Sequence, residues 1–367
     1  MIRGRVEQRG NTVTLDGAAV PIEYIVDGID LPPINEMSFA VWHLLPTAMR
    51  KGQDLHIEGC VDAATLANAE RLARAWAMWV PGRYHRVKVS ADTTARSSRP
   101  DRPRDSLIFF SGGIDSSYHM LERGPRSEAG YVLTMLNEAY ASRAALDQLA
   151  EKTAPLLAHL NYRRIAVRTN ARDFCKPAAL MHGFTLAGCA FLLSDLFPDV
   201  ELAADYSWEQ DVLVFPWGTN HVTNRYFASS DFAVHSVTAD VTRTEKMPLI
   251  AASDVAQKAV SFCVNKAARP HNCGRCTKCV RTKGMFLAST GALPPSFRDV
   301  TWRASDLLNT DMSNRKDRTF MFDLYDYAKR HDRLHLLPGI EPLIRNAEKP
   351  WRRTAHRYAA LLRERIA

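Results

Sequence analysis

The segment LIFFSGGIDSSYHMLERG, from Leu107 to Gly124, restricts the folds open to this chain more than any other segment. Four apolar residues, typical of a buried strand, lead into two adjacent glycines, and a helix-like sequence follows. Apolar runs and helix-like stretches then alternate up to about residue 250. This alternation indicates βαβ units and predicts an α/β fold with a parallel sheet. Such sheets bind ligands beyond the carboxyl ends of their strands, which is where the glycine-containing loop is expected to lie.

The same patterns divide the chain into three expected parts. They are a small N-terminal α/β domain at residues 1–95, a central domain at 105–290 and a helical C-terminal region at 291–367. The polar, basic stretch Asp92–Ser106 is interpreted as a linker, with a domain boundary near residue 100. In the central domain we expect strands at Leu107–Phe110, Gly130–Leu136, Arg164–Thr169 and Val212–Phe215, and helices at Ser116–Arg123, Ser142–Leu160 and Phe184–Leu196. The C-terminal KPWRRTAHRYAALLRERIA is expected to form an amphipathic helix.

The loop itself has the properties of a phosphate-binding site. Gly112 and Gly113 can take backbone angles closed to other residues and leave room for an anion. The N–H groups at the start of the next helix favour a phosphate, and Ser111, Ser116 and Ser117 add hydroxyl groups. Asp115 would repel phosphate, unless a Mg²⁺ ion lies between them. The loop lacks the Gly-Lys-Ser/Thr of a Walker loop and the third glycine of a dinucleotide fingerprint.

The whole segment resembles the Ser-Gly-Gly-x-Asp-Ser loop of the PP-loop ATP pyrophosphatases. This resemblance implies a fold of the adenine nucleotide alpha hydrolase type and cleavage of ATP between its α- and β-phosphates. A substrate carboxylate or amide oxygen would be activated as an adenylate, and a nitrogen or sulfur nucleophile would displace AMP. The loop would hold the pyrophosphate, with ATP and Mg²⁺ as required ligands.

Four of the seven cysteines lie within 17 residues, at Cys263, Cys273, Cys276 and Cys279. Four thiolates at this spacing suit a closed, structural Zn²⁺ site, and an iron–sulfur cluster is the main alternative. Unliganded cysteines are the third interpretation. An odd cysteine count and no signal-peptide pattern argue against a disulfide framework.

Together, the loop and the cysteines resemble the 7-cyano-7-deazaguanine synthase family of the queuosine pathway over residues 105–290. That family ends its zinc site in Cys-Gly-x-Cys-x-x-Cys followed by an arginine, and this chain has CGRCTKC followed by Arg281. The family also has a Thr/Asp-Lys-x-Glu segment. Here the segment reads Thr242-Arg243-Thr244-Glu245, with arginine in place of lysine. The resemblance implies that Arg243 offsets charge at the α-phosphate, with Asp115 as the second catalytic residue. For the substrate itself, His182, Asn220 and Arg225 are the candidate contacts.

Composition leaves the partners open. The chain has 367 residues, a net charge of +8 and 46% hydrophobic residues, and its patterns suggest neither a signal peptide nor a membrane span. We expect a cytoplasmic protein that acts on a small-molecule or protein carboxylate with ammonia or an amine as donor, with a homodimer as one possible assembly. Nucleic acid is a further candidate partner that no motif indicates. Two other functions stay open: a tRNA-modifying or thiolating PP-loop enzyme, and an ATP-binding protein without turnover.

Overall fold

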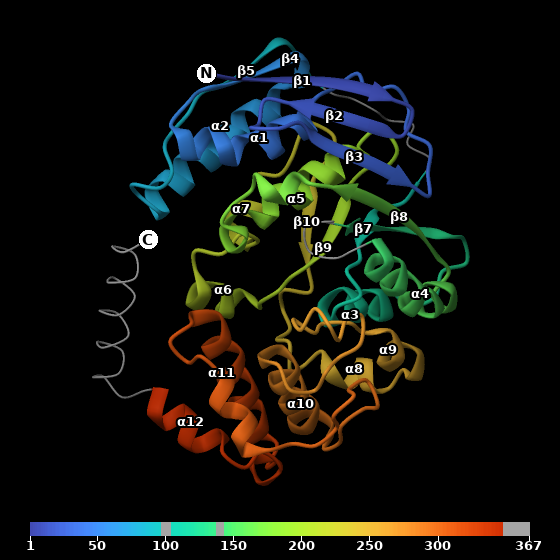
Figure 1. Ribbon diagram of the computed structural model, residues 1–367, viewed down its shortest axis with the longest axis vertical. Coiled ribbons are helices and arrows are strands. Elements are labelled where there is room, and N and C mark those ends of the chain that lie inside the picture. The colour runs from blue at the N-terminus through green and yellow to red at the C-terminus, as the bar shows by residue number, and fades with distance from the viewer. Residues whose placement is uncertain (97–103, 137–142, 348–367) are drawn as a thin grey trace.

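The strands of this protein form one mostly parallel sheet, which confirms the expected α/β class. The computed structural model describes residues 1–96, 104–136 and 143–347, and Figure 1 shows its elements. Among these residues there are ten strands, joined in a single sheet, and twelve α-helices. Six of the nine strand pairs are parallel.

The central part of the chain forms a parallel half-sheet. Its strands are β6 (Leu107–Phe109), β7 (Gly130–Leu136), β8 (Tyr162–Thr169), β9 (Val200–Ala203) and β10 (Val234–Val237). They lie in the order β10-β9-β6-β7-β8. From β6 the chain moves outward through β7 and β8, and then returns to the other side of β6. β6 therefore stands where the strand order reverses, which is the usual ligand site of an open α/β sheet.

Helices connect these strands largely as expected. They are α3 (Ile114–Arg123), α4 (Arg143–His159), the short η1 (Ala171–Asp173), α5 (Ala178–Phe191), α6 (Trp208–Val214) and α7 (His221–Asn224). The expected strand at Val212–Phe215 is wrong, because these residues fall mainly in α6. Gln210 Oε1 accepts a hydrogen bond from the Ser207 N–H (3.2 Å), which favours a helix start. Val212 and Leu213 then lie on the solvated face of this helix, 72% and 53% exposed, whereas Val214 is buried.

The first 96 residues extend the same sheet. β1 (Ile2–Arg9), β2 (Thr12–Asp16) and β3 (Ile22–Asp27) form an antiparallel meander, and β4 (Leu55–Asp62) and β5 (Val89–Ala95) pair in parallel beside β1. The helices α1 (Ser38–Lys51) and α2 (Ala63–Trp79) cover this half. β5 continues through part of the expected linker, and residues 97–103 of that linker lie outside the described residues.

The N-terminal unit joins the central half through β3, which pairs antiparallel with β8. Helices α1 and α5 pack against each other at this junction, with the rings of Trp42 and Phe191 5.6 Å apart. One hydrophobic core includes residues from both sides of residue 100. The two α/β units therefore share a sheet and a core.

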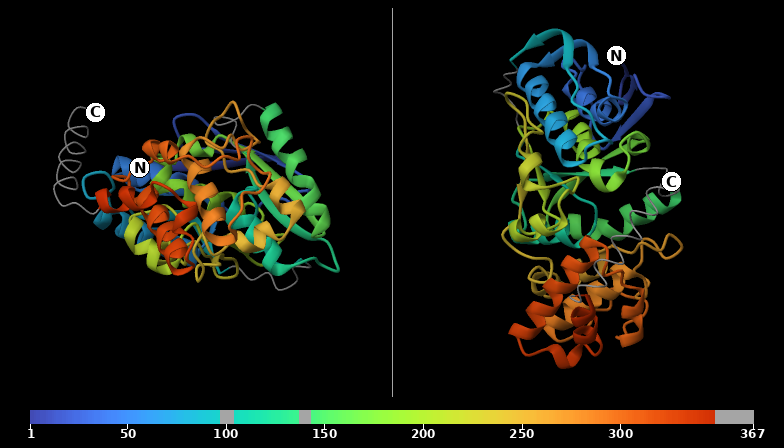
Figure 2. Two further views of the ribbon diagram at one scale, coloured as in Figure 1. Left: turned by 90° about the horizontal axis from the view of Figure 1, so that it is seen from below. Right: turned by 90° about the vertical axis from the view of Figure 1, so that its left-hand side faces the viewer.

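Helices form the opposite end of the molecule, as Figure 2 shows. They are α8 (Met247–Ala251), α9 (Asp254–Ala259), α10 (Thr277–Thr290), η2 (Ala304–Asn309), α11 (Arg315–Arg330), η3 (Leu334–Leu336) and α12 (Ile340–Ala347). A second core, which includes Phe286, Met321 and Leu324, holds them together. The expected terminal helix after residue 348 lies outside the described residues. No helix in the described ranges combines the length and apolar character needed to cross a membrane.

Candidate functional site

The glycine loop leaves the carboxyl end of β6 and turns directly into α3. Gly112 has a φ of 72°, and a Cβ atom there would lie 2.9 Å from Thr153 Cγ2. Glycine therefore suits this turn better than any other residue. Gly113 is the N-cap residue of α3. An anion in front of the loop would meet free N–H groups and the positive end of the helix dipole.

The three serines of the loop lie in different surroundings. Ser111 lines the cavity in front of the loop, and its Oγ accepts a hydrogen bond from the Gly113 N–H (3.3 Å). Ser116 Oγ accepts one from the Ser111 N–H (3.3 Å), and Ser117 is fully buried. Of the six predicted phosphate-binding residues, Ser111, Gly113 and Asp115 line the cavity, and the other three shape the loop behind it.

Two cations neutralise Asp115. Its Oδ1 accepts hydrogen bonds from Arg243 Nε (3.2 Å) and Lys246 Nζ (3.1 Å), and its Oδ2 accepts one from Arg243 Nη2 (2.5 Å). Lys246 is 1% exposed. Asp115 therefore presents little negative charge to the cavity and instead holds Arg243 beside the loop.

A second carboxylate, Asp205, lies on another side of Arg243. Its Oδ1 is 3.6 Å from Arg243 Nη2, and its Oδ2 accepts hydrogen bonds from Trp217 Nε1 (3.1 Å) and Thr219 Oγ1 (3.2 Å). Burial raises the pKa of Asp205, but the interactions with His182, Arg243 and Trp217 outweigh it and hold the pKa well below its usual range. Asp205 was not predicted from the sequence, because β9, the strand before it, was not predicted. A carboxylate just after a parallel strand is the signal that could have found it.

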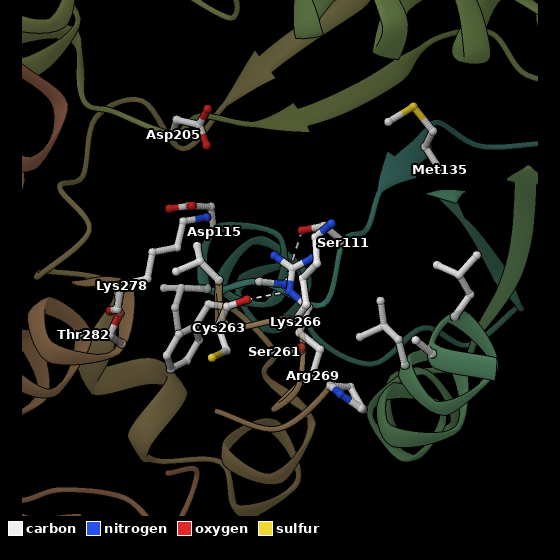
Figure 3. A pocket seen from close by; sticks show the side chains of 18 of the residues that line it. Ser111, Asp115, Met135, Asp205, Ser261, Cys263, Lys266, Arg269, Lys278 and Thr282 are labelled. Carbon is white, nitrogen blue, oxygen red and sulfur yellow. Dashed lines mark hydrogen bonds between the residues drawn. The ribbon is translucent and has the colours of Figure 1, made fainter. Parts of the chain in front are cut away.

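The cavity in front of the loop has a volume of about 650 Å³ and a strongly positive lining (Figure 3). Among the residues that the structure describes, seven basic side chains line it against two acidic ones, Asp115 and Asp205. The basic residues are Arg172, Arg243, Lys266, Arg269, Lys278, Arg281 and Lys316. On the side opposite Lys278, Met135 and residues of α4 form an apolar wall. The cavity therefore suits a ligand with one highly anionic part and one apolar part.

The pKa values of the buried cations reflect this surplus of positive charge. Burial and the charges of Arg281 and Arg243 lower the pKa of Lys278 to about 8. Burial and the charge of Arg243 lower the pKa of Arg281 to about 10. An anion bound among these groups would relieve their mutual repulsion.

Helix α11 fixes the arginines from behind. Phe320 contacts both guanidinium groups, with its ring centre 4.3 Å from Arg243 Cζ and 4.0 Å from Arg281 Cζ. Asp317 Oδ1 accepts a hydrogen bond from Arg281 Nη1 (3.1 Å). Asp323 Oδ2 accepts hydrogen bonds from the N–H and the hydroxyl of Thr244, the neighbour of Arg243. The C-terminal helices are therefore part of the site, a role that no local motif in α11 indicates.

The four clustered cysteines come together beneath the cavity. Their sulfur atoms all lie within 4.8 Å of one another, so they could hold a metal ion. The N–H groups of Arg275 and Cys276 donate to Cys273 Sγ at 3.4 and 3.3 Å. Gly274 has a φ of 80°, and a Cβ atom there would lie 2.2 Å from the Asp299 carbonyl oxygen. The turn between Cys273 and Cys276 therefore requires this glycine.

The cysteine cluster and the glycine loop are directly connected. The Ser261 N–H, two residues before Cys263, donates to the Gly112 carbonyl oxygen at 2.7 Å. Cys276 is the N-cap residue of α10, whose first turns supply Lys278 and Arg281 to the cavity. A metal ion in the cluster would therefore hold one wall of the cavity in place.

Comparisons with protein-family models, curated proteins and solved structures find no match to this chain. The three candidate substrate contacts lie outside the residues that line the cavity. His182 Nδ1 donates to the Ala178 carbonyl oxygen (2.9 Å), and its Nε2 lies 3.0 Å from Thr219 Oγ1 and 3.8 Å from Asp205 Oδ2. Asn220 caps α7, and Arg225 is exposed beside Tyr226. Of the three side chains, only His182 contacts a residue that lines the cavity.

Proposed function

We propose that this protein is an ATP-dependent ligase of the PP-loop type. A carboxylate or amide oxygen of the substrate attacks the α-phosphate of ATP, the bond to the β-phosphate breaks, and pyrophosphate leaves. Ammonia or an amine then attacks the activated carbon, and AMP leaves. The observation that carries the proposal is the cavity at the strand-order reversal, where seven basic and two acidic side chains meet a glycine loop. A triphosphate supplies the negative charge that this lining lacks.

Each part of the lining has a role in this proposal. The free N–H groups at the start of α3 and the hydroxyl of Ser111 bind the β- and γ-phosphates. Arg243, held by Asp115, stabilises the charge that develops at the α-phosphate, and Lys278 and Arg281 face the same space. The apolar wall around Met135 takes the less polar part of the nucleotide or of the acyl substrate.

A Mg²⁺ ion fits this site best at Asp205. Mg²⁺ in nucleotide sites is held by one or two carboxylates together with phosphate oxygens. Both oxygens of Asp115 already accept hydrogen bonds from Arg243 or Lys246, whereas the Asp205 side chain is 37% exposed. Asp205 would therefore hold the ion, and Asp115 would position Arg243.

For the cysteine cluster we propose Zn²⁺. Zn–S bonds of about 2.3 Å in a tetrahedron place neighbouring sulfur atoms about 3.8 Å apart. The Sγ atoms are 3.7 Å apart in Cys263 and Cys276 and 3.9 Å apart in Cys273 and Cys279. In a [4Fe–4S] cluster each cysteine binds a different iron, which requires wider spacing. This zinc site and the order of the motifs support the resemblance to the 7-cyano-7-deazaguanine synthases.

The test is to identify the nucleotide products. We expect AMP and pyrophosphate when the full-length protein is incubated with ATP, Mg²⁺, ammonium and a panel of carboxylates that includes carboxydeazaguanine. Asp115→Ala should reduce AMP formation at least 1000-fold, because Arg243 and Lys246 lose their common partner. Asp147→Ala, an exposed aspartate on α4 outside the cavity, is the matched control.

The other outcomes separate the alternatives. ADP and phosphate as products would contradict α–β cleavage. ATP binding without turnover across the panel and with tRNA would favour an ATP-binding protein. AMP formation that requires tRNA would favour a tRNA-modifying enzyme.

A further inference from the structure

A second basic concavity, of about 520 Å³, lies beside the first cavity. Its lining consists of Arg50, Arg83, Arg172, Lys176, Pro177 and Ala178. Four of these six residues are basic and none is acidic. Like charges gathered in one hollow repel each other and destabilise the folded chain unless an anion joins them. Lys176 Nζ lies 3.9 Å from Asp173 Oδ1, and both of these side chains are exposed to solvent.

Hydrogen bonds hold the walls of this concavity together. Arg50 lies in the last turn of α1 and Arg83 lies in the loop after α2. The His85 N–H donates to the Met49 carbonyl oxygen (2.9 Å), which keeps the two segments side by side. Thr47 Oγ1 donates to the Phe174 carbonyl oxygen (3.5 Å), which ties α1 to the segment of Arg172 and Lys176. The fold therefore brings together the segments that carry the four cations.

The concavity adjoins the proposed ATP site. Arg172 lines both hollows. It lies in η1, just after the carboxyl end of β8, and β8 is two strands away from β6. Both hollows therefore open along the same edge of the parallel sheet. A ligand anchored in the second hollow can extend past Arg172 towards the glycine loop.

We propose that this second concavity binds the phosphate group of the acyl substrate, so that the substrate is a small phosphorylated carboxylate. The volume lies in the range of small-molecule pockets, and two or three cations suffice for one phosphate. The assignment of this ligand as the acyl substrate rests on the proposed function. The binding of a phosphate-bearing carboxylate does not.

The test uses phosphoglycolate as the probe and glycolate as its unphosphorylated counterpart. Binding to the full-length protein is measured by calorimetry at fixed ionic strength without nucleotide, so that the result is independent of ATP binding. We expect phosphoglycolate to bind and glycolate to bind at least tenfold more weakly. The double variant Arg50→Gln/Arg83→Gln should weaken phosphoglycolate binding at least tenfold. Both residues are exposed, and glutamine keeps most of the side-chain length.

The control is Arg5→Gln/Arg9→Gln, which removes the same charge from exposed positions of β1 outside both hollows. It should leave the affinity within twofold of the unmodified protein. Equal losses in both variants, or no loss in Arg50→Gln/Arg83→Gln, would overturn the proposal. A further measurement uses a 12-nucleotide single-stranded RNA. If this RNA binds the unmodified protein but not the Arg50→Gln/Arg83→Gln variant, and phosphoglycolate binds neither, the proposal is overturned in favour of nucleic acid.

Discussion

Two buried polar clusters in this protein are built in opposite ways. Beside the glycine loop, Asp115, Arg243 and Lys246 form a charged cluster in a cavity whose cations outnumber its carboxylates. At the junction of α1 and α5, His43 Nδ1 lies 2.6 Å from the Tyr24 hydroxyl, and Nε2 lies 3.1 Å from the Thr185 carbonyl oxygen. This second cluster is neutral, and both ring nitrogens have partners. A surplus of buried charge points to a ligand, whereas a balanced neutral cluster points to a structural joint.

Removal of the cysteine site should disturb the charged cluster most, because it releases the wall that carries Lys278 and Arg281. We expect Cys276→Ser to lose the bound metal, to lose AMP formation at least 1000-fold, and to lower the free energy of unfolding by several kcal/mol. Elemental analysis, product assays and urea unfolding measure these effects. Cys60→Ser, a half-buried cysteine on β4, is the control and should keep all three properties. A metal-free Cys276→Ser protein with full activity would show that AMP formation does not depend on the metal.

Arg243→Lys keeps the charge but loses the two-pronged contact with Asp115. We expect kcat/KM for ATP cleavage to fall about 100-fold, with a change in unfolding free energy within about 1 kcal/mol. Steady-state kinetics and urea unfolding are the measurements. Arg123→Lys is the matched control, since Arg123 pairs with Glu201 away from the cavity. Equal losses in both variants would mean that the geometry of the Arg243 contact has no special importance.

The neutral cluster should respond to pH through stability. Burial lowers the pKa of His43 to about 4. The unfolded chain binds this proton near pH 6.5 and the folded chain does not, so the folded protein loses stability as the pH falls from 6.5 towards 4. We expect this histidine to account for a loss of about 2 kcal/mol between pH 7.5 and pH 5. Urea unfolding at both pH values tests this, and His43→Gln should remove that part of the loss. An identical pH dependence in the variant would show that His43 does not titrate in this way.

Phe320→Leu tests the smallest effect, the support of the charged cluster by α11. Leucine keeps apolar volume but removes the ring that contacts Arg243 and Arg281. We expect kcat/KM to fall about tenfold, since two such contacts contribute about 1–2 kcal/mol together. Phe322→Leu on the same helix provides the comparison and should change kcat/KM less than twofold. A similar fall in both variants would indicate general loosening of α11.

The sequence predicted those parts of the site that one short segment contains. The glycine loop, the cysteine cluster and Arg243 each follow from local residue types and spacing, and the structure brings them to one cavity. Phe320 is 77 residues from Arg243 in the chain, and only tertiary packing brings them into contact. Asp205 was missed for a different reason. β9 has only four residues, and one of them is the charged Glu201, whose side chain contacts His119 (2.6 Å). The sequence of this strand therefore lacks the continuous apolar pattern that would have predicted it.

The fold was predicted best where strands and helices are long. The α/β class, β7, α3 and α4 follow from periodicity, and the continuation of the sheet through β3 and β8 does not. Pairing between β3 and β8 connects residues about 140 positions apart, and the sequence of neither strand indicates which strand lies beside it. The error at Val212–Phe215 is local, because four consecutive apolar residues suit a strand and a short helix equally well.

The pairing of β3 with β8 has a practical consequence for shortening this chain. Without the first 95 residues, β8 would become an outer strand with a row of unpaired N–H and C=O groups, next to the uncovered apolar side of α5. An exposed edge strand of this kind promotes association between copies of the chain and aggregation. The N-terminal unit thus shields the β8 edge of the central half-sheet, whatever else it contributes.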